Sequence, residues 1–170
     1  MKIRPATRYD IDRLVAIDRI AYGKHGANNQ YFQNKFQAFP QGILVVEKNG
    51  LVTGFTVIEL LNAGQTPKDF TDFKPAEPLV GVWMHIIAFT TATNYQDVKA
   101  DSELVAAAEK IGKQYGAVAV GVPLSKDHPY AKNGVFDFWQ SNGYKLAGEI
   151  NWVASPDKKI ECYFYKKDIN

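Results

Sequence analysis

The stretch that organises this sequence is residues 80–116, which read VGVWMHIIAFTTATNYQDVKADSELVAAAEKIGKQYG. Its first part, residues 80–89, is apolar and rich in β-branched and aromatic residues, which is typical of a buried strand. A polar loop, residues 90–99, follows. Apolar residues then recur at helical spacing as far as Gly116, a residue type that commonly ends helices; they are Leu104, Val105, Ala108, Ile111 and Tyr115. A helix that starts after such a loop presents free backbone N–H groups, so this order predicts a site for a phosphate-bearing ligand.

The composition is that of an ordinary globular protein. The chain has 170 residues, and its twenty basic and eighteen acidic side chains give a formal net charge of +2. This charge is too small to indicate a nucleic acid or an anionic membrane as partner. No apolar run is long enough to span a membrane, and the N-terminal residues do not resemble a signal peptide. With Cys162 as its single cysteine the chain forms no internal disulfide. We therefore expect one cytoplasmic domain, residues 1–170.

The N-terminal part alternates strands and helices. Residues 1–4 predict a short strand, and Thr7 with Asp10 forms a capping-box pattern before a helix that ends near Gly23. Residues 23–42 predict a second helix that ends before Pro40. Its aromatic residues either pack in the core or line an acceptor pocket; they are Tyr31, Phe32, Phe36 and Phe39.

Asn49-Gly50 is the strongest hairpin signal in the chain and joins strands at residues 43–47 and 51–60. Residues 62–79 form a long break with three prolines, which predicts a functional or mobile loop. Residues 117–122 predict a strand, residues 123–132 a polar loop and residues 135–141 a short helix. Two more strands are predicted at residues 144–153 and 160–166. This order predicts an α/β (α+β) domain with a mixed, mostly antiparallel sheet of about six to seven strands.

Four segments resemble the GNAT superfamily of N-acetyltransferases, and the element order matches that family over residues 2–166. IRPATRYDIDRL (3–14) resembles its opening strand and helix, and LVVEKNGLVTGF (44–55) resembles its β-hairpin. FWQSNGY (138–144) resembles the end of its last helix. Residues 96–101, QDVKAD, stand where the family has Q/R-x-x-G-x-G/A.

The resemblance implies the GNAT fold, with helices on both faces of the sheet and a splay between the strands at 80–89 and 117–122. It implies acetyl-CoA as co-substrate and transfer of the acetyl group to a primary amine of a small molecule or protein, by direct attack on the thioester. It implies no metal. The residues expected to bind the cofactor are Ile87, Ala88 and Phe89 at the thioester, Gln96, Asp97, Val98, Lys99, Ala100, Asp101 and Ser102 at the pyrophosphate, and Asn133 and Trp139 near the pantetheine arm.

His85 is the candidate general base, because it aligns with a catalytic glutamate in one branch of the family and histidine titrates near neutrality. The alternative is a strand histidine satisfied within the core. His128 is a second candidate. Trp139 stands where the family often has a tyrosine that protonates the thiolate, and an indole N–H is too weak an acid for that task. Tyr130 and Tyr144 are therefore the candidate acids, and simple packing is the alternative role of Trp139.

Two residues of the segment 96–101 depart from the family pattern. Lys99 and Asp101 replace glycines that let the backbone approach the pyrophosphate. Asp97 and Asp101 add negative charge, and Asp101 or Ser102 is expected to cap the helix and so compete with phosphate for its N–H groups. This predicts weakened cofactor binding. It also motivates two alternatives, a GNAT-fold binding or scaffolding protein that does not acetylate, and a protein that takes a different acyl-CoA. The strand with Tyr163, Phe164 and Tyr165 is either a homodimer interface or an ordinary sheet strand.

Overall fold

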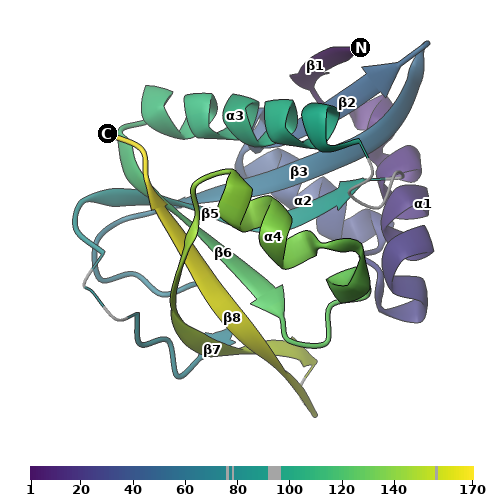
Figure 1. The fold of residues 1–170 in the computed structure, drawn as a ribbon. Helices are drawn as coiled ribbons and strands as arrows, with labels where there is room; N and C mark the ends of the chain where they lie inside the picture. Colours follow the sequence, from purple (N-terminus) through teal and green to yellow (C-terminus); the bar gives the residue numbers. More distant parts are fainter. Residues whose placement is uncertain (76, 78, 92–96, 156) are drawn as a thin grey trace. The chain divides into compact units, whose positions relative to one another are not determined.

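A computed structural model describes residues 1–75, 77, 79–91, 97–155 and 157–170, and the chain divides into two compact units. The first unit comprises Met1–Glu59 and Ile87–Ile111, and the second comprises Leu60–Ile86 and Gly112–Asn170. The boundaries fall inside β3 (Leu51–Leu61), β5 (Val82–Thr91) and α3 (Val98–Gln114), so these three elements contribute to both units (Figure 1).

The first unit contains β1 (Lys2–Pro5), α1 (Ile11–Tyr22), α2 (Asn29–Ala38) and β2 (Ile43–Lys48), together with its share of β3, β5 and α3. The short 3₁₀ turns η1 (Arg8–Asp10), η2 (Gly23–His25) and η3 (Pro40–Gly42) connect them. β1, β2 and β3 pair antiparallel, and the β2–β3 turn has positive φ at both Asn49 (51°) and Gly50 (77°). This is the geometry that an Asn-Gly hairpin turn requires, so the predicted hairpin is present.

The core of the first unit is an apolar cluster between its helices and strands. Phe32 of α2 meets Phe55 of β3 edge to face, with 5.3 Å between ring centroids. The other buried members are Ala6, Ile11, Leu14, Ile17, Ile43, Val45, Val52 and Val57. At one side of this unit Arg4 donates hydrogen bonds to Asp10 and to Glu47, which ties β1 to η1 and to β2.

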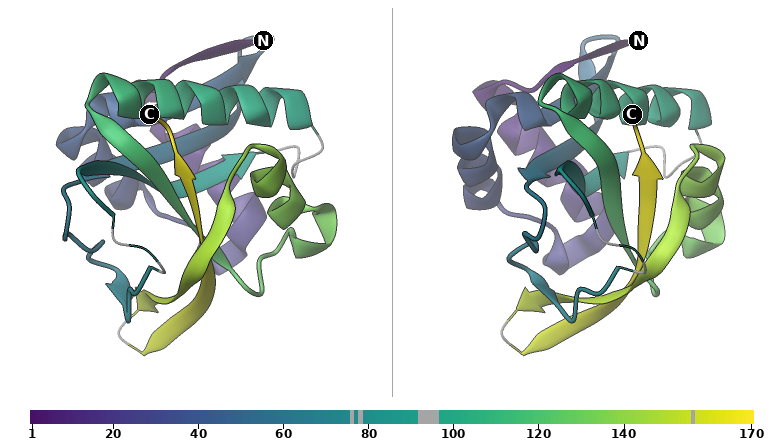
Figure 2. Two further views of the ribbon diagram at one scale, coloured as in Figure 1. Left: turned by 60° about the vertical axis from the view of Figure 1, so that its left-hand side comes forward. Right: turned by 90° about the vertical axis from the view of Figure 1, so that its left-hand side faces the viewer.

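The second unit contains β4 (Phe70–Thr71), β6 (Ala117–Ser125), η4 (Ala131–Asn133), α4 (Val135–Ser141), β7 (Lys145–Ser155) and β8 (Lys158–Asp168). β6 and β8 pair antiparallel, as do β7 and β8, and Figure 2 shows these three strands as neighbours in both views. The buried core joins Trp83, Phe70 and Phe164, together with Ala119, Ile150 and Cys162.

The strand order is β1-β2-β3-β5-β6-β8-β7-β4, in which β5 and β6 run parallel. The sequence predicted the class of this mixed sheet but not its eight strands. The additional strand is β4, which lies inside the stretch 62–79 that was expected to be a loop, and it pairs with Trp152 and Asn151 of β7. β5 also lies two residues further along the chain than expected, and β6 extends three residues further, to Ser125.

Candidate functional site

β5 changes its surroundings halfway along its length. Its parallel ladder with β6 runs from the pair Val82–Ala117 to the pair His85–Gly121, and among the described residues it ends there. β5 itself continues to Thr91. A Cβ atom at Gly121 would lie 2.5 Å from Phe164 and 2.7 Å from Trp83, so only glycine fits at the last pair. The main chain of residues 87–89 therefore follows a point where the ladder with β6 has already ended.

The residues expected at the thioester lie on this continuing part of β5, in the first unit. Ile87 and Ala88 are half-buried, and Phe89 is buried. On the side of β3, the hydroxyl of Thr56 donates a hydrogen bond to the carbonyl oxygen of Ala88 at 3.0 Å. One contact with the neighbouring strand β3 thus helps to fix the segment.

Asp97 caps the N-terminus of α3. The backbone N–H of Ala100 donates to Asp97 Oδ1 at 3.1 Å, and the ammonium group of Lys48 forms an ion pair with Asp97 Oδ2. The hydrogen bond from Lys48, followed by that from Ala100, lowers the pKa of Asp97. A helix N-terminus with a nearby lysine is a favourable place for an anion. Here the carboxylate of Asp97 fills that place.

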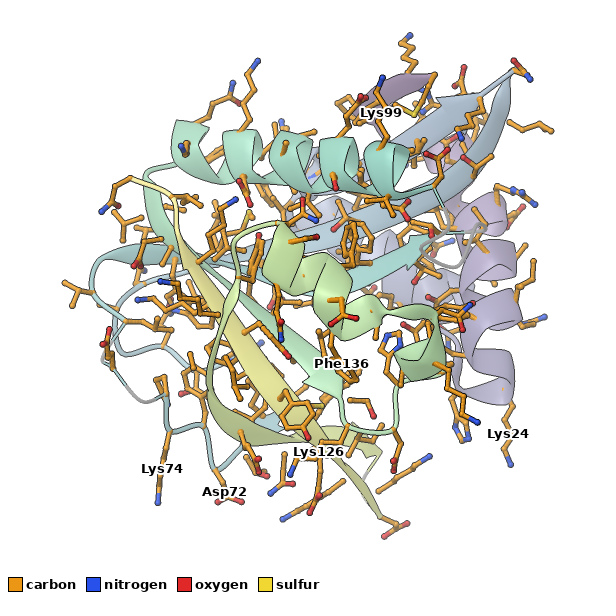
Figure 3. All side chains as sticks on the ribbon, viewed as in Figure 1. Lys24, Asp72, Lys74, Lys99, Lys126 and Phe136 are labelled. Carbon is orange, nitrogen blue, oxygen red and sulfur yellow. The ribbon has the colours of Figure 1, made fainter. Side chains whose placement is uncertain are left out.

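The expectation that Asp101 or Ser102 caps this helix is wrong. α3 begins at Val98, so Asp101 is its fourth residue and lies beyond the capping position. Its backbone N–H donates to the carbonyl oxygen of Asp97 at 3.0 Å. Ser102 is half-buried, while Val98 and Lys99 are exposed and Ala100 is buried. Figure 3 shows Lys99 extending away from the first turn of α3.

Asp101 is a buried carboxyl group, with 2% of its surface exposed. Its Oδ2 has no hydrogen-bond partner among the described residues. Burial raises the pKa of Asp101 to about 7, and the charge of Asp97 adds to this effect, whereas Lys48 and a hydrogen bond from Thr91 oppose it. The group is therefore only partly ionised at neutral pH, and the repulsion expected between its charge and a phosphate is smaller than the sequence indicated. Gln96, the other loop residue of interest, lies outside the described residues.

A second buried carboxyl group, that of Asp18 on α1, contacts the end of β5 from within the same unit. The hydroxyl of Thr90 donates to Asp18 Oδ1 at 2.9 Å, and the backbone N–H of Ala27 donates to Asp18 Oδ2 at 2.7 Å. Burial raises the pKa of Asp18, and these two hydrogen bonds act against that rise.

His85 belongs to the second unit and is enclosed by aromatic rings. It is 2% exposed. Its ring centroid lies 5.0 Å from that of Phe70, in an edge-on arrangement, and 5.8 Å from that of Trp83. Phe70 comes from the stretch that was expected to be a long loop. This enclosure agrees with the alternative of a core histidine, and its role as general base stays a prediction.

His128 is held in one tautomer. The backbone N–H of Tyr130 donates to His128 Nδ1 at 3.1 Å, and burial lowers the pKa of His128 to about 4. In a neutral imidazole whose Nδ1 accepts a hydrogen bond, the proton is on Nε2. Neither nitrogen then offers a free lone pair at neutral pH. This geometry favours a structural role in the turn after β6 and makes His128 a poor candidate for a general base.

The other candidate residues of the second unit lie on or beside α4. Trp139 is fully buried and meets Tyr144 edge to face, with 4.9 Å between ring centroids. Tyr144 is 1% exposed. Tyr130 is half-buried, and Asn133 lies exposed in η4. The contact between Trp139 and Tyr144 supports the packing alternative for Trp139, and the roles of all four residues stay predictions.

Each unit also has a pocket that none of these candidate residues lines. In the first unit a pocket of about 470 Å³ is lined by Arg8, Ile11, Asp12, Asn29, Gln33, Phe36 and Gln37. Of the aromatic residues considered for an acceptor pocket, Phe36 therefore lines a pocket, whereas Phe32 packs in the core. In the second unit a pocket of about 120 Å³ is lined by Lys126 and Glu149, which form an ion pair at 2.7 Å.

The described part of the chain contains neither a candidate membrane span nor a candidate metal site. None of its helices has both the length and the apolar character needed to cross a membrane. Its His, Cys, Asp and Glu side chains form no group of three or more arranged to hold a metal ion.

Sequence reasoning missed Lys48, Asp18 and Thr90. Lys48 is 49 positions away from Asp97 in the chain, so no local pattern indicates their ion pair. The burial of Asp18 could have been predicted from the sequence, because this residue follows Leu14 by four positions and Ile11 by seven. It therefore falls on the apolar face of its helix.

No protein-family model matches this sequence, and no curated protein matches it. Solved structures do match its fold. The GNAT-like decarboxylase GphF in complex with isobutyryl-CoA superposes with a TM-score of 0.76 at 15% identity, over 100% of both chains. Naa20 from Chaetomium thermophilum, in complex with a bisubstrate analogue, gives 0.73 at 16% identity, over 99% of this chain and 86% of that one.

A ribosomal-protein-alanine N-acetyltransferase from Brucella melitensis gives a TM-score of 0.68 at 14% identity, over 99% of each chain. Together with the strand order and the early end of the β5–β6 ladder, these similarities establish the architecture. The chain therefore has the fold of the GNAT superfamily.

Proposed function

We propose that this protein is an acetyl-CoA-dependent N-acetyltransferase that transfers an acetyl group to a primary amine of a small molecule or protein. The observation that carries this proposal is the early end of the β5–β6 ladder, after which β5 continues through residues 87–89 to Thr91. A strand edge of this kind binds an extended ligand through main-chain hydrogen bonds. The amide bonds of a pantetheine arm provide the matching donors and acceptors.

In the proposed reaction the acceptor amine attacks the thioester carbonyl directly. A backbone N–H of residues 87–89 stabilises the oxyanion, which is typically worth a few kcal/mol when such a donor is fixed in place. His85 takes the proton from the amine, and Tyr130 or Tyr144 supplies a proton to the departing thiolate. The N–H groups at the start of α3, together with Lys48 and Lys99, bind the pyrophosphate. Gln96, Asn133 and Trp139 are assigned to the cofactor by the resemblance.

Two structural neighbours support separate parts of this proposal, the decarboxylase GphF the binding of a CoA thioester and the Brucella melitensis protein the transfer to an amine. The GphF neighbour is in complex with a CoA thioester, and the Brucella melitensis neighbour is an N-acetyltransferase. A reaction of this class needs two reactants held in contact and one proton removed, and histidine is a residue type that can remove such a proton.

The occupied N-terminus of α3 favours a second candidate, a GNAT-fold binding or scaffolding protein that does not acetylate. Asp97 already accepts the hydrogen bond of Ala100 and the ion pair of Lys48, so a phosphate has to displace its carboxylate. A third candidate is a protein that takes an acyl-CoA other than acetyl-CoA.

Unfolding in urea with and without acetyl-CoA separates these candidates. A ligand present at one hundred times its dissociation constant stabilises the folded state by about 2.7 kcal/mol. We expect stabilisation by acetyl-CoA, and release of the CoA thiol when a primary amine is added. Stabilisation by propionyl- or malonyl-CoA in its place would identify the third candidate. If none of these thioesters stabilises the protein at millimolar concentration, the transferase proposal is wrong and the binding-protein candidate takes its place.

A further inference from the structure

Asp18 is an ionisable residue on a helix face that is otherwise apolar. Its neighbours on that face of α1, Leu14 and Ile17, are 0% and 1% exposed and belong to the core of the first unit. Asp18 itself is 6% exposed. Burying a carboxyl group costs free energy, which here is offset by the hydrogen bonds that it accepts from Thr90 and Ala27.

The two oxygens of Asp18 join two segments that are far apart in the sequence. Oδ1 accepts the hydrogen bond of Thr90, which directly follows Phe89 on β5. Oδ2 accepts the N–H of Ala27, which lies between η2 and α2. A carboxylate that accepts one bond on each oxygen from two separate segments fixes their spacing, because either segment can move only by breaking its bond.

Thr90 and Thr91 give this end of β5 two different anchors. Successive side chains of a strand point to opposite faces. Thr90 donates to Asp18 of α1, and Thr91 bonds to Asp101 of α3. The first anchor also reaches the segment between α1 and α2, because Asp18 accepts the N–H of Ala27.

We propose that Asp18 is a positioning residue for acetyl transfer. Through Thr90 it holds the main chain that follows residues 87–89, and through Ala27 it holds the segment that leads into α2. In this way it sets the distance between the strand that binds the thioester and the segment expected to line the acceptor site. This inference rests on the proposed function, because it assigns a role to Asp18 in that same reaction.

Hydrogen exchange tests the coupling without requiring any activity. Thr90→Val removes the hydroxyl and keeps the shape of the side chain, so Asp18 loses one of its two anchors. We expect exchange of the Ala27 amide to accelerate at least about fivefold in this variant, because its acceptor becomes free to rotate. Thr90→Ser restores the hydroxyl and should restore slow exchange. Thr91→Val, the matched control on the opposite face, should leave the Ala27 amide unchanged.

Kinetics with acetyl-CoA and lysine as the amine probe test the positioning role. A misplacement on the order of 1 Å can cost a factor of about 100 in rate. We therefore expect Thr90→Val and Asp18→Asn to lower kcat by about ten- to a hundredfold, with the KM for acetyl-CoA changed less than about twofold. Thr90→Ser should stay within about threefold of the wild type. Ile17→Val, a core change beside Asp18, should leave both constants nearly unchanged.

Each result decides a separate claim. If Thr90→Val leaves both the Ala27 exchange rate and kcat unchanged, or if Ser fails to rescue, Asp18 does not couple the two segments. If Ile17→Val lowers kcat as much as Thr90→Val does, the effect is general destabilisation and the positioning role is wrong. If the wild type neither binds acetyl-CoA nor releases CoA, the proposed function fails and the catalytic role fails with it. The exchange experiment then still shows whether the coupling exists.

Discussion

At neutral pH the carboxyl group of Asp101 is near the midpoint of its titration, because burial raises its pKa to about 7. In an unfolded chain an aspartate titrates near pH 3.9. Between these values the folded protein keeps the proton and the unfolded chain has lost it. At this site the unfolded state therefore binds fewer protons in this window, and the contribution of Asp101 to the free energy of unfolding falls as the pH rises from about 4 to about 7.

Asp101→Asn should remove this pH dependence. A difference of about three pH units, at about 1.4 kcal/mol each, sets an upper bound of about 4 kcal/mol on the stability lost between pH 4 and pH 8. The variant should thus be more stable than the wild type at pH 8, and the difference should shrink toward pH 4. Urea unfolding between pH 4 and pH 8 measures this difference in stability between the variant and the wild type. Asp12→Asn, an exposed change on α1, is the control, and parallel curves for wild type and Asp101→Asn would contradict the titration of Asp101.

His85 gives the second prediction at this scale. If it removes the proton from the amine, His85→Gln should lower kcat by about 10²- to 10⁴-fold, the usual contribution of a general base. The acidic limb of the pH–rate profile should disappear as well, because glutamine does not titrate. His25, which is exposed in η2, supplies the control His25→Gln. An unchanged profile in His85→Gln would leave this histidine with the core role that its contacts with Phe70 and Trp83 already suggest.

Among the elements, those encoded by local pattern were predictable from the sequence. The helix from Ile11 follows the apolar spacing, and the turn at Asn49-Gly50 follows from two residues that tolerate positive φ. β4 was not predictable, because it is two residues long and exists through its pairing with β7, about 80 residues further along the chain. Such pairing leaves no periodicity in the sequence.

The start of α3 shows the same limit within the candidate site. Asp97 and Asp101 are both favourable capping residues, so the sequence alone does not decide between them. The ion pair with Lys48 favours Asp97, and this contact comes from the distant β2–β3 hairpin. The location of the loop was therefore predictable from its neighbours, whereas the residue that fills the helix N-terminus was not.

Asp97→Ser should strengthen the binding of CoA. Serine still caps the helix but carries no charge, so the N–H groups of α3 and the ammonium group of Lys48 become available to phosphate. We expect the dissociation constant to fall about tenfold, which corresponds to about 1.4 kcal/mol. Titration calorimetry at two salt concentrations measures the dissociation constant, and the gain in affinity should be smaller at high salt. Glu103→Ser removes an exposed charge from the same helix and is the control. Weaker binding in Asp97→Ser would mean that Asp97 organises the loop for the ligand.

At the scale of the whole molecule, the two units share elements. The chain passes from one unit to the other at three places, which lie inside β3, β5 and α3. A strand or helix that crosses such a boundary has no flexible linker at which the units can unfold separately. Unfolding one unit removes part of an element from the other, so we expect a single cooperative transition, as for one domain of 170 residues.

The distribution of spectroscopic probes allows this cooperativity to be measured directly. The three tryptophans, Trp83, Trp139 and Trp152, all belong to the second unit, whereas α1, α2 and most of α3 belong to the first. Tryptophan fluorescence therefore reports on the second unit, and helical circular dichroism reports mainly on the first. Leu14→Ala, at a fully buried position of α1, should cost about 2–5 kcal/mol and should lower the urea midpoint equally by both probes. A shift in circular dichroism without a matching shift in fluorescence would show that the second unit folds independently of the first.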